Sequence, residues 1–346
     1  MRRGYFAAVI FWLFTGLSTS VMSQDIHFSQ FTAAPLMLNP ALSGLNGCDY
    51  RATAIFKGQW GGISANRSFA YRTLSTSFDM AMFKGPKYAN FGGIGLSMYS
   101  DQAGDGNFST NKVDVSMAYH IMLDKFGKQG LSIGIQGGLG HRSIDQSLLY
   151  FDTQFDPDFG FDPNGDKEFI ERDKFFYGDI AAGLIWHLTP NERSNYYTGI
   201  SITHLNQPNL SFQNQPSEKL YMKFSIAGGA LIPLAEKFDV MPSFQVLSQG
   251  PAFQANIGSY LKFKTDPMDV SKPSVLIGSW VRLTNPIDGL IFAARTDFSG
   301  FSVAFSYDVT ISSLSSATYG NGGPELSLIY TGCMKKAKSA SYCPRL

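Results

Sequence analysis

The chain has 346 residues, of which 44% are hydrophobic and only 16% are charged, and its formal net charge is +1 at pH 7. This balance shows no basic surplus of the kind that indicates nucleic-acid binding, while 35 glycines and 29 phenylalanines favour β structure with many tight turns. After the leader, no run approaches the roughly 20 apolar residues of a membrane-spanning helix, so a membrane location would require a β-barrel.

Residues 1–23 have the features of a secretory signal peptide. Two arginines form a charged start, residues 6–14 form an apolar run, and Val21 and Ser23 suit the positions before a cleavage site. The apolar run is too short for a stable transmembrane helix. We therefore expect export and a mature chain that begins at or near Gln24.

Residues 24–48 are apolar and interrupted by prolines, and their hydrophobic pattern fits neither a strand nor a full helix. Pro35 and Pro40 prevent the segment from joining the interior of a sheet. We predict a plug that packs into the periplasmic mouth of a barrel, because an exposed apolar segment would be an aggregation hazard. Binding to a partner is the alternative. The residues assigned to the plug are Phe28, Phe31, Pro35, Leu36, Leu38, Asn39, Pro40 and Leu42.

From Asp49 to Gly332 the dominant period is two, which is the signature of strands. About fourteen segments show it, with lengths that suit a tilted membrane crossing and the even number typical of bacterial barrels. A soluble sandwich would alternate equally well, but with strands nearer five or six residues. The predicted fold is therefore all-β, a transmembrane antiparallel β-barrel over residues 49–332, followed by a periplasmic tail at 333–346. The predicted strands are 51–60, 69–80, 91–100, 112–122, 130–142, 176–188, 195–206, 220–232, 238–249, 252–264, 274–283, 288–298, 301–310 and 324–332.

The predicted inner face of this barrel carries both signs of charge. Such a mixture indicates a salt-bridged or solvated interior, because a selective pore would show a ring of one sign. The residues on this face are Lys57, Asp114, His120, Asp179, His187, Lys223, Lys262, Arg282, Arg295, Asp297 and Asp308.

If both ends of the chain face the periplasm, we expect the longest connection, 143–175, to face outward, and it is strongly acidic. We predict that it docks a partner or remains a solvated acidic loop. Residues 162–168 also space oxygen side chains as calcium loops do, but the glycine lies one place early for an EF-hand. The docking candidates in this loop are Asp152, Asp156, Asp158, Asp162, Asn164, Asp166 and Glu168.

The histidines show no metal-binding spacing, and no catalytic residue, metal or cofactor is assigned. His204 falls on the predicted lipid face of residues 196–204, where the neighbouring hydroxyls point to the opposite side and cannot form a catalytic dyad with it. The sequence therefore predicts a protein that is not an enzyme.

The three cysteines of the exported chain lie close to the ends of the predicted barrel. Cys48 precedes the first strand, while Cys333 and Cys343 follow the last one, and these ends are neighbours in a closed barrel. Export permits a disulfide. We expect a bridge from Cys48 to Cys333 or Cys343, with free thiols as the alternative.

The N-terminal pattern resembles the start of the PorP/SprF family. Its elements are Asp25, Phe28-Ser29-Gln30, Pro35-Leu36, Asn39-Pro40-Ala41 and Gly44, followed by a strand that ends in Gln59-Trp60. The loop sequence QFDPDFGFDPN at 154–164 is similar to the corresponding loop of that family, and Cys343-Pro344 resembles the ending of its SprF-like branch.

This resemblance implies an outer-membrane barrel of the type IX secretion and gliding machinery of Bacteroidota, surrounded by membrane lipid. It also implies a non-enzymatic role, either in secretion beside periplasmic ring proteins or in anchoring a secreted surface adhesin. A transport channel for small or hydrophobic solutes, with the N-terminal segment as its plug, is the alternative.

Overall fold

The computed structural model describes residues 25–333 with several short gaps. The gaps are 62–68, 84–89, 105, 157, 159, 163–164, 166, 169, 192, 214, 216–217, 267–271, 285–286, 313–314 and 319–320. The predicted leader at 1–23 and the tail from 334 onward lie outside the described residues, so both assignments stay predictions.

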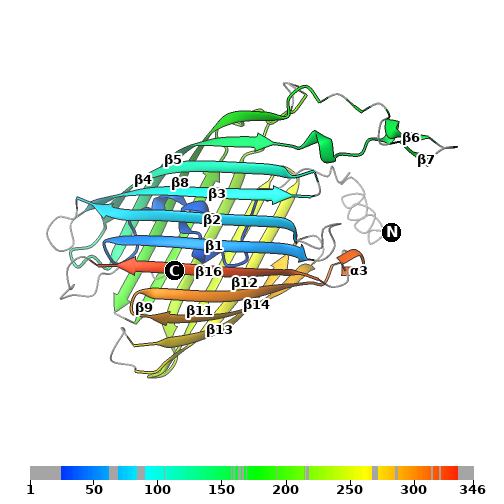
Figure 1. Ribbon diagram of the computed structural model, residues 1–346. Coiled ribbons are helices and arrows are strands. Elements are labelled where there is room, and N and C mark those ends of the chain that lie inside the picture. Colours follow the sequence, from blue (N-terminus) through cyan, green and yellow to red (C-terminus); the bar gives the residue numbers. More distant parts are fainter. Residues whose placement is uncertain are drawn as a thin grey trace, which may run out of the picture.

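Fourteen antiparallel strands close into a barrel in which β1 pairs with β16 (Figure 1). This arrangement confirms the predicted all-β fold. The barrel strands are β1 (Tyr50–Gly61), β2 (Phe69–Met82), β3 (Phe91–Ala103), β4 (Phe108–Met122), β5 (Gln129–Ser143), β8 (Lys174–Asn191), β9 (Ser194–Thr203), β10 (Lys223–Pro233), β11 (Phe238–Gln249), β12 (Ala252–Lys264), β13 (Ser274–Leu283), β14 (Ile287–Phe298), β15 (Phe301–Thr310) and β16 (Gly323–Gly332).

The barrel wall is apolar outside because side chains alternate along each strand. In β4, Val115 and Met117 are exposed, whereas Lys112, Asp114 and Ser116 point inward and are buried. An outward apolar band around a polar inner face is the pattern of membrane barrels. Among the described residues, no helix is long and apolar enough to cross a membrane.

The two ends of the barrel differ. At one end, here called the Cys48 end, β1 begins and β16 finishes, and Cys48 forms a disulfide with Cys333 across a Cα–Cα distance of 4.8 Å. Cys333 directly follows Gly332, which pairs with Tyr50 at the start of β1, so it lies beside Cys48. Of the two predicted bridges, the one to Cys343 is therefore not formed, and Cys343 itself lies outside the described residues.

The opposite end, here called the loop end, carries the longest connections, 144–173, 204–222 and 311–322. The first of these projects beyond the strand ends and includes a small hairpin (Figure 1). The remaining short elements at the loop end are η3 (Gln146–Leu148), η4 (Asp152–Gln154), β6 (Phe155–Asp156), β7 (Gly160–Phe161) and α3 (Ser315–Thr318).

Candidate functional site in the barrel lumen

The barrel lumen is occupied by the chain segment that precedes β1. Residues 25–45, here called the luminal segment, contain the short turns η1 (Phe31–Ala33), α2 (Pro35–Leu38) and η2 (Pro40–Leu42), drawn in dark blue inside the barrel in Figure 1. All eight residues assigned to the plug from the sequence are buried, and Leu36 and Leu42 are fully so.

The prolines and Asn39 explain why this segment folds into short turns. Pro35 and Pro40 each start a turn, where a missing backbone N–H costs no hydrogen bond. The Asn39 side chain caps η2 by accepting from the Ala41 N–H at 2.9 Å. Its Nδ2 donates to the wall carbonyl of Ile200 at 2.9 Å. One side chain thus both shapes the turn and attaches it to the barrel.

Glycines on the inner wall let the segment's backbone touch the strands. A Cβ added to Gly134 in β5 would lie 2.3 Å from the Ala41 nitrogen, and one added to Gly93 in β3 would lie 1.8 Å from the Ser43 carbonyl oxygen. Gly183 in β8 faces the Asn39 side chain in the same way. A larger residue at any of these positions would have to displace the segment, so the wall is shaped to receive η2 and the residues that flank it.

The luminal segment runs along the lumen from one end to the other. At the Cys48 end, the Gly44 N–H donates to the carboxylate of Asp79 at 2.8 Å. Arg51 binds the same carboxylate through its Nε at 2.9 Å and donates to the Leu42 carbonyl at 3.1 Å. A fully buried carboxylate is thereby paired with an arginine and with the segment's backbone, as a buried charge requires.

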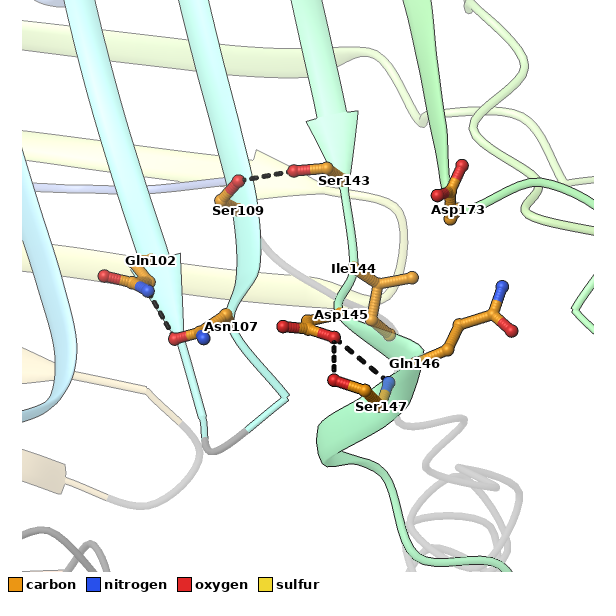
Figure 2. A pocket seen from close by; sticks show the side chains of 9 residues that line it. All are labelled: Gln102, Asn107, Ser109, Ser143, Ile144, Asp145, Gln146, Ser147 and Asp173. Atoms are coloured by element: carbon orange, nitrogen blue, oxygen red, sulfur yellow. Dashed lines mark hydrogen bonds between the residues drawn. The ribbon is translucent and has the colours of Figure 1, made fainter. Parts of the chain in front are cut away.

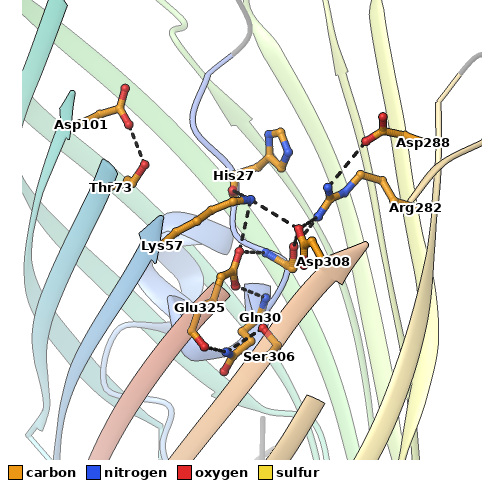
Figure 3. A network of polar contacts seen from close by, with 11 residues as sticks. His27, Gln30, Lys57, Thr73, Asp101, Arg282, Asp288, Ser306, Asp308 and Glu325 are labelled. Atoms are coloured by element: carbon orange, nitrogen blue, oxygen red, sulfur yellow. Dashed lines mark hydrogen bonds and ion pairs between the residues drawn. The ribbon is translucent and has the colours of Figure 1, made fainter. Parts of the chain in front are cut away.

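A second polar network holds the segment nearer the loop end (Figure 3). The two carboxylate oxygens of Glu325 accept from the backbone N–H groups of Ser29 and Gln30 at 2.8 and 2.9 Å. Asp308 accepts from the Ser29 hydroxyl at 2.6 Å and is paired with Arg282. Bonds that involve charged groups are stronger than neutral ones, so this stretch is fixed in one register.

The start of the segment is fixed by a third ionic cluster at the loop end. The carboxylate of Asp25 lies 2.6 Å from His204 Nε2 and 2.7 Å from Lys223 Nζ, and its backbone N–H donates to Gln249 at 2.9 Å. The second ring nitrogen of His204 lies 2.9 Å from Asp179. We call Asp25 and His204 with Lys223 and Asp179 the latch.

The charged groups of the latch shift each other's pKa values. Burial disfavours the charged form of Asp25, but Lys223 and His204 outweigh it and hold the pKa of Asp25 well below its usual range. Burial likewise disfavours a charged His204, yet the carboxylates of Asp25 and Asp179 raise its pKa above its ordinary value. A protonated His204 can donate to both carboxylates at once.

These contacts correct two predictions. The plug was expected in the mouth beside the start of β1, but Asp25 reaches the loop end, so the segment spans the lumen. His204 was expected on the lipid face, but it is 3% exposed and points inward. The reason is local: β9 ends at Thr203, and His204 adopts a positive φ of 59°, which turns its side chain off the strand's alternation.

The lumen contains buried apolar side chains as well as the charged residues predicted for the inner face. Trp280, Tyr260 and Ile291 form a buried apolar cluster with Phe31 and Leu42 of the luminal segment. Several residues predicted for the inner face form ion pairs there, as in Asp179 with Lys112 at 2.5 Å and Lys262 with Asp297 at 2.9 Å. The lumen is thus packed like a protein core, with ionic attachments along the wall.

His120 of β4 connects the wall to the luminal segment. His120 is fully buried, with one ring nitrogen 2.7 Å from the Ser132 hydroxyl and the other 2.9 Å from the Ser43 carbonyl. One ring nitrogen thus contacts the neighbouring wall strand β5, and the other contacts the luminal segment.

The acidic loop lies outside the lumen. Asp152, Asp156, Asp158, Asp162 and Glu168 are all exposed on or near the β6–β7 hairpin, while Asn164 and Asp166 lie outside the described residues. The part of the chain that the structure describes contains no group of three or more His, Cys, Asp or Glu residues that could hold a metal ion.

A polar hollow of about 640 Å³ lies at the base of this loop (Figure 2). Gln102 and Asn107 are joined there by a hydrogen bond, and Asp145 accepts from the backbone and hydroxyl of Ser147 at 3.0 and 2.5 Å. Its lining consists mainly of amide, hydroxyl and carboxylate groups. The residues are Gln102, Asn107, Ser109, Ser143, Ile144, Asp145, Gln146, Ser147 and Asp173.

Among solved structures, the chain is similar to several barrels at very low identity. A TodX deltaS2S3 mutant monoaromatic hydrocarbon channel has a TM-score of 0.48 at 8% identity, over 86% of this chain and 92% of that one. The toluene transporter TbuX of Ralstonia pickettii has a TM-score of 0.48 at 11% identity, over 86% and 92%. The translocator domain of the autotransporter NalP from Neisseria meningitidis has a TM-score of 0.36 at 11% identity, over 88% and 96%.

Sequence comparisons give a clearer result. No curated protein matches the chain. The family described as type IX secretion system membrane protein PorP/SprF matches residues 20–330, which include the luminal segment and nearly all of the barrel.

Proposed function

The chain belongs to the PorP/SprF family of type IX secretion system membrane proteins and is an outer-membrane β-barrel, and we propose that it is a non-enzymatic barrel that anchors a secreted surface adhesin or supports its secretion. In this proposal the loop end faces the cell exterior, the Cys48 end faces the periplasm, and the luminal segment is a plug. Its partners are the secreted adhesin at the surface and secretion proteins of the periplasmic ring.

The observation that carries the proposal is the filled lumen. Residues 25–45 are held by charged clusters at both ends of the lumen and by the Asn39 contacts between them. A channel would need residues 25–45 to leave the lumen, and the buried carboxylates of Asp79 and Glu325 would then lose the backbone N–H groups that bind them. A barrel closed in this way is suited to holding a partner rather than to passing solutes.

The acidic loop is the docking surface that we propose on the outside. Four exposed aspartates, Asp152, Asp156, Asp158 and Asp162, surround the β6–β7 hairpin, where Phe155 is also exposed. Irregular loops on a rigid scaffold commonly carry binding sites, and exposed aromatic side chains are frequent anchors at interfaces.

The test is to neutralise these four aspartates together as asparagines in the native gene and to measure adhesin display on intact cells by antibody labelling. The proposal expects display to fall, with the adhesin released to the medium if anchoring is lost, or retained inside if secretion is lost. Glu236→Gln, an exposed acidic residue at the Cys48 end, is the control for loss of charge alone. Normal display in the four-site variant and after removal of residues 144–173 would refute docking through this loop.

A transport channel is the second candidate, favoured by two water-sized cavities of about 20 and 40 Å³ between residues 26–28 and the wall of β10, β11 and β12. Planar bilayer recordings of the purified protein separate the two functions. Steady open conductance would support transport, whereas a silent barrel would support the closed anchor.

A further inference from the structure

The seam of the barrel is the ladder in which the first strand, β1, meets the last, β16. It is joined by eight described residue pairs, from Tyr50–Gly332 to Lys57–Glu325, as are β8–β9 and β15–β16, compared with fifteen between β5 and β8. Because every second residue pair of an antiparallel ladder exchanges main-chain hydrogen bonds, a short ladder has fewer bonds to resist separation of its strands. Other contacts across the seam therefore matter for keeping the barrel closed.

At the loop end, the luminal segment bonds to both seam strands. Lys57 of β1 and Glu325 of β16 are opposite each other in the ladder, and their charged groups lie 3.2 Å apart. Lys57 also donates to the His27 carbonyl at 3.2 Å, while Glu325 accepts the two N–H groups of Ser29 and Gln30. The segment thus bridges the two strands through one ionic pair.

In the middle of the seam, the bridge is apolar. Phe28, Ala33 and Ala34 of the luminal segment pack in one cluster with Ile55 of β1 and Ile329 of β16. Ile55 is 1% exposed. Sliding or parting of the two strands would expose this cluster, so its burial opposes both movements.

At the Cys48 end, the bridge is covalent. The disulfide joins Cys48, which follows the luminal segment, to Cys333, which follows β16. The seam therefore has three successive cross-connections along its length: a disulfide, an apolar cluster and an ionic network. All three involve the luminal segment or the residues that connect it directly to β1.

We propose that the luminal segment and the Cys48–Cys333 disulfide form a clamp that keeps the β1–β16 seam from opening sideways into the membrane. Because residues 27–30 bond to both seam strands, their displacement from the lumen would weaken the closure of the barrel wall. Opening of the seam would in turn release these residues from the lumen. This role goes beyond the proposed function and holds whether or not an adhesin is the partner.

The test is hydrogen–deuterium exchange, read by mass spectrometry, on the full-length protein in detergent micelles. Glu325→Gln removes the charge that pairs with Lys57 and replaces one acceptor oxygen by a donor. Since charged hydrogen bonds contribute strongly, we expect exchange at residues 50–57 and 325–332 to accelerate roughly tenfold, with β12 and β13 unchanged. Asp297→Asn is the matched control, because Asp297 pairs with Lys262 and Arg295 on the wall.

A second measurement uses the unmodified protein, so that the result does not depend on whether the variant folds. Reduction with dithiothreitol should accelerate exchange next to Cys48 and Cys333 and leave strands far from the seam unchanged. Acceleration confined to the seam in either experiment supports the clamp. Equal acceleration in all strands, or no acceleration at the seam in both experiments, overturns it.

Discussion

Replacing Gly134 by alanine tests whether the barrel wall is shaped to receive the luminal segment. The new Cβ would lie 2.3 Å from the Ala41 nitrogen and 2.5 Å from the Pro40 carbonyl carbon. Carbon atoms in contact sit about 3.5–4.0 Å apart, so the η2 turn must move by about 1 Å. Ala41 and Leu42 are fully buried, and forcing extra atoms into a packed core costs about 1–3 kcal/mol.

Gly137→Ala is a matched control on the same strand, because nothing lies within 4 Å of its added Cβ. Both variants would be refolded in detergent micelles and titrated with urea, with the folded fraction read from heat-modifiable mobility in gel electrophoresis. We expect Gly134→Ala to lose about 1–3 kcal/mol of unfolding free energy and to become more sensitive to protease within residues 25–45. Equal stability and equal protease resistance of the two variants would refute the argument that η2 rests directly on the wall.

Three further predictions concern the attachments of the luminal segment. Asn39→Ala removes the η2 cap and its bonds to the wall carbonyls, so it should destabilise the protein by about 2–3 kcal/mol in the same urea titration. The raised pKa of His204 and the lowered pKa of Asp25 make the latch strongest between about pH 4 and pH 6.5. The contribution of His204 is lost as the pH rises through its raised pKa, so cleavage of residues 25–30 should increase over that rise in the wild type and show no such step in His204→Gln. Reducing the Cys48–Cys333 disulfide should lower the unfolding free energy by about 2–4 kcal/mol, and an unchanged urea midpoint after complete reduction would contradict this expectation.

The strands were predictable because their physical requirement is local. Along each wall strand, side chains that point outward must be apolar and those that point inward must be small or polar, which gives the period of two. The observed bounds of β11, β12 and β13 are the predicted 238–249, 252–264 and 274–283. The burial of Leu36 and Leu42 also follows from composition. An apolar segment that fits neither a strand nor a full helix must be shielded from water by the rest of the protein. Strand pairing then follows from chain order alone, since sequence neighbours pair around the barrel.

The path of the luminal segment through the barrel could not be predicted from the sequence in this way. Which wall residue meets Ser29 or Gln30 depends on long-range register, and Glu325 lies 296 residues from Ser29 in the chain. The inward turn of His204 depends on one positive φ angle, which a period-two pattern does not reveal. The sequence does contain one usable signal: small residues at inward positions, such as Gly134, leave room for another backbone.

The luminal segment also changes the topology of the chain. Fourteen strands alone would bring both chain ends to the same side of the barrel, yet Asp25 lies at the loop end and Cys333 at the Cys48 end. The segment acts as a fifteenth pass through the barrel, so the described chain makes an odd number of passes and starts and finishes at opposite openings. A reporter fused ahead of Asp25 and one fused after Cys333 would therefore report on opposite compartments.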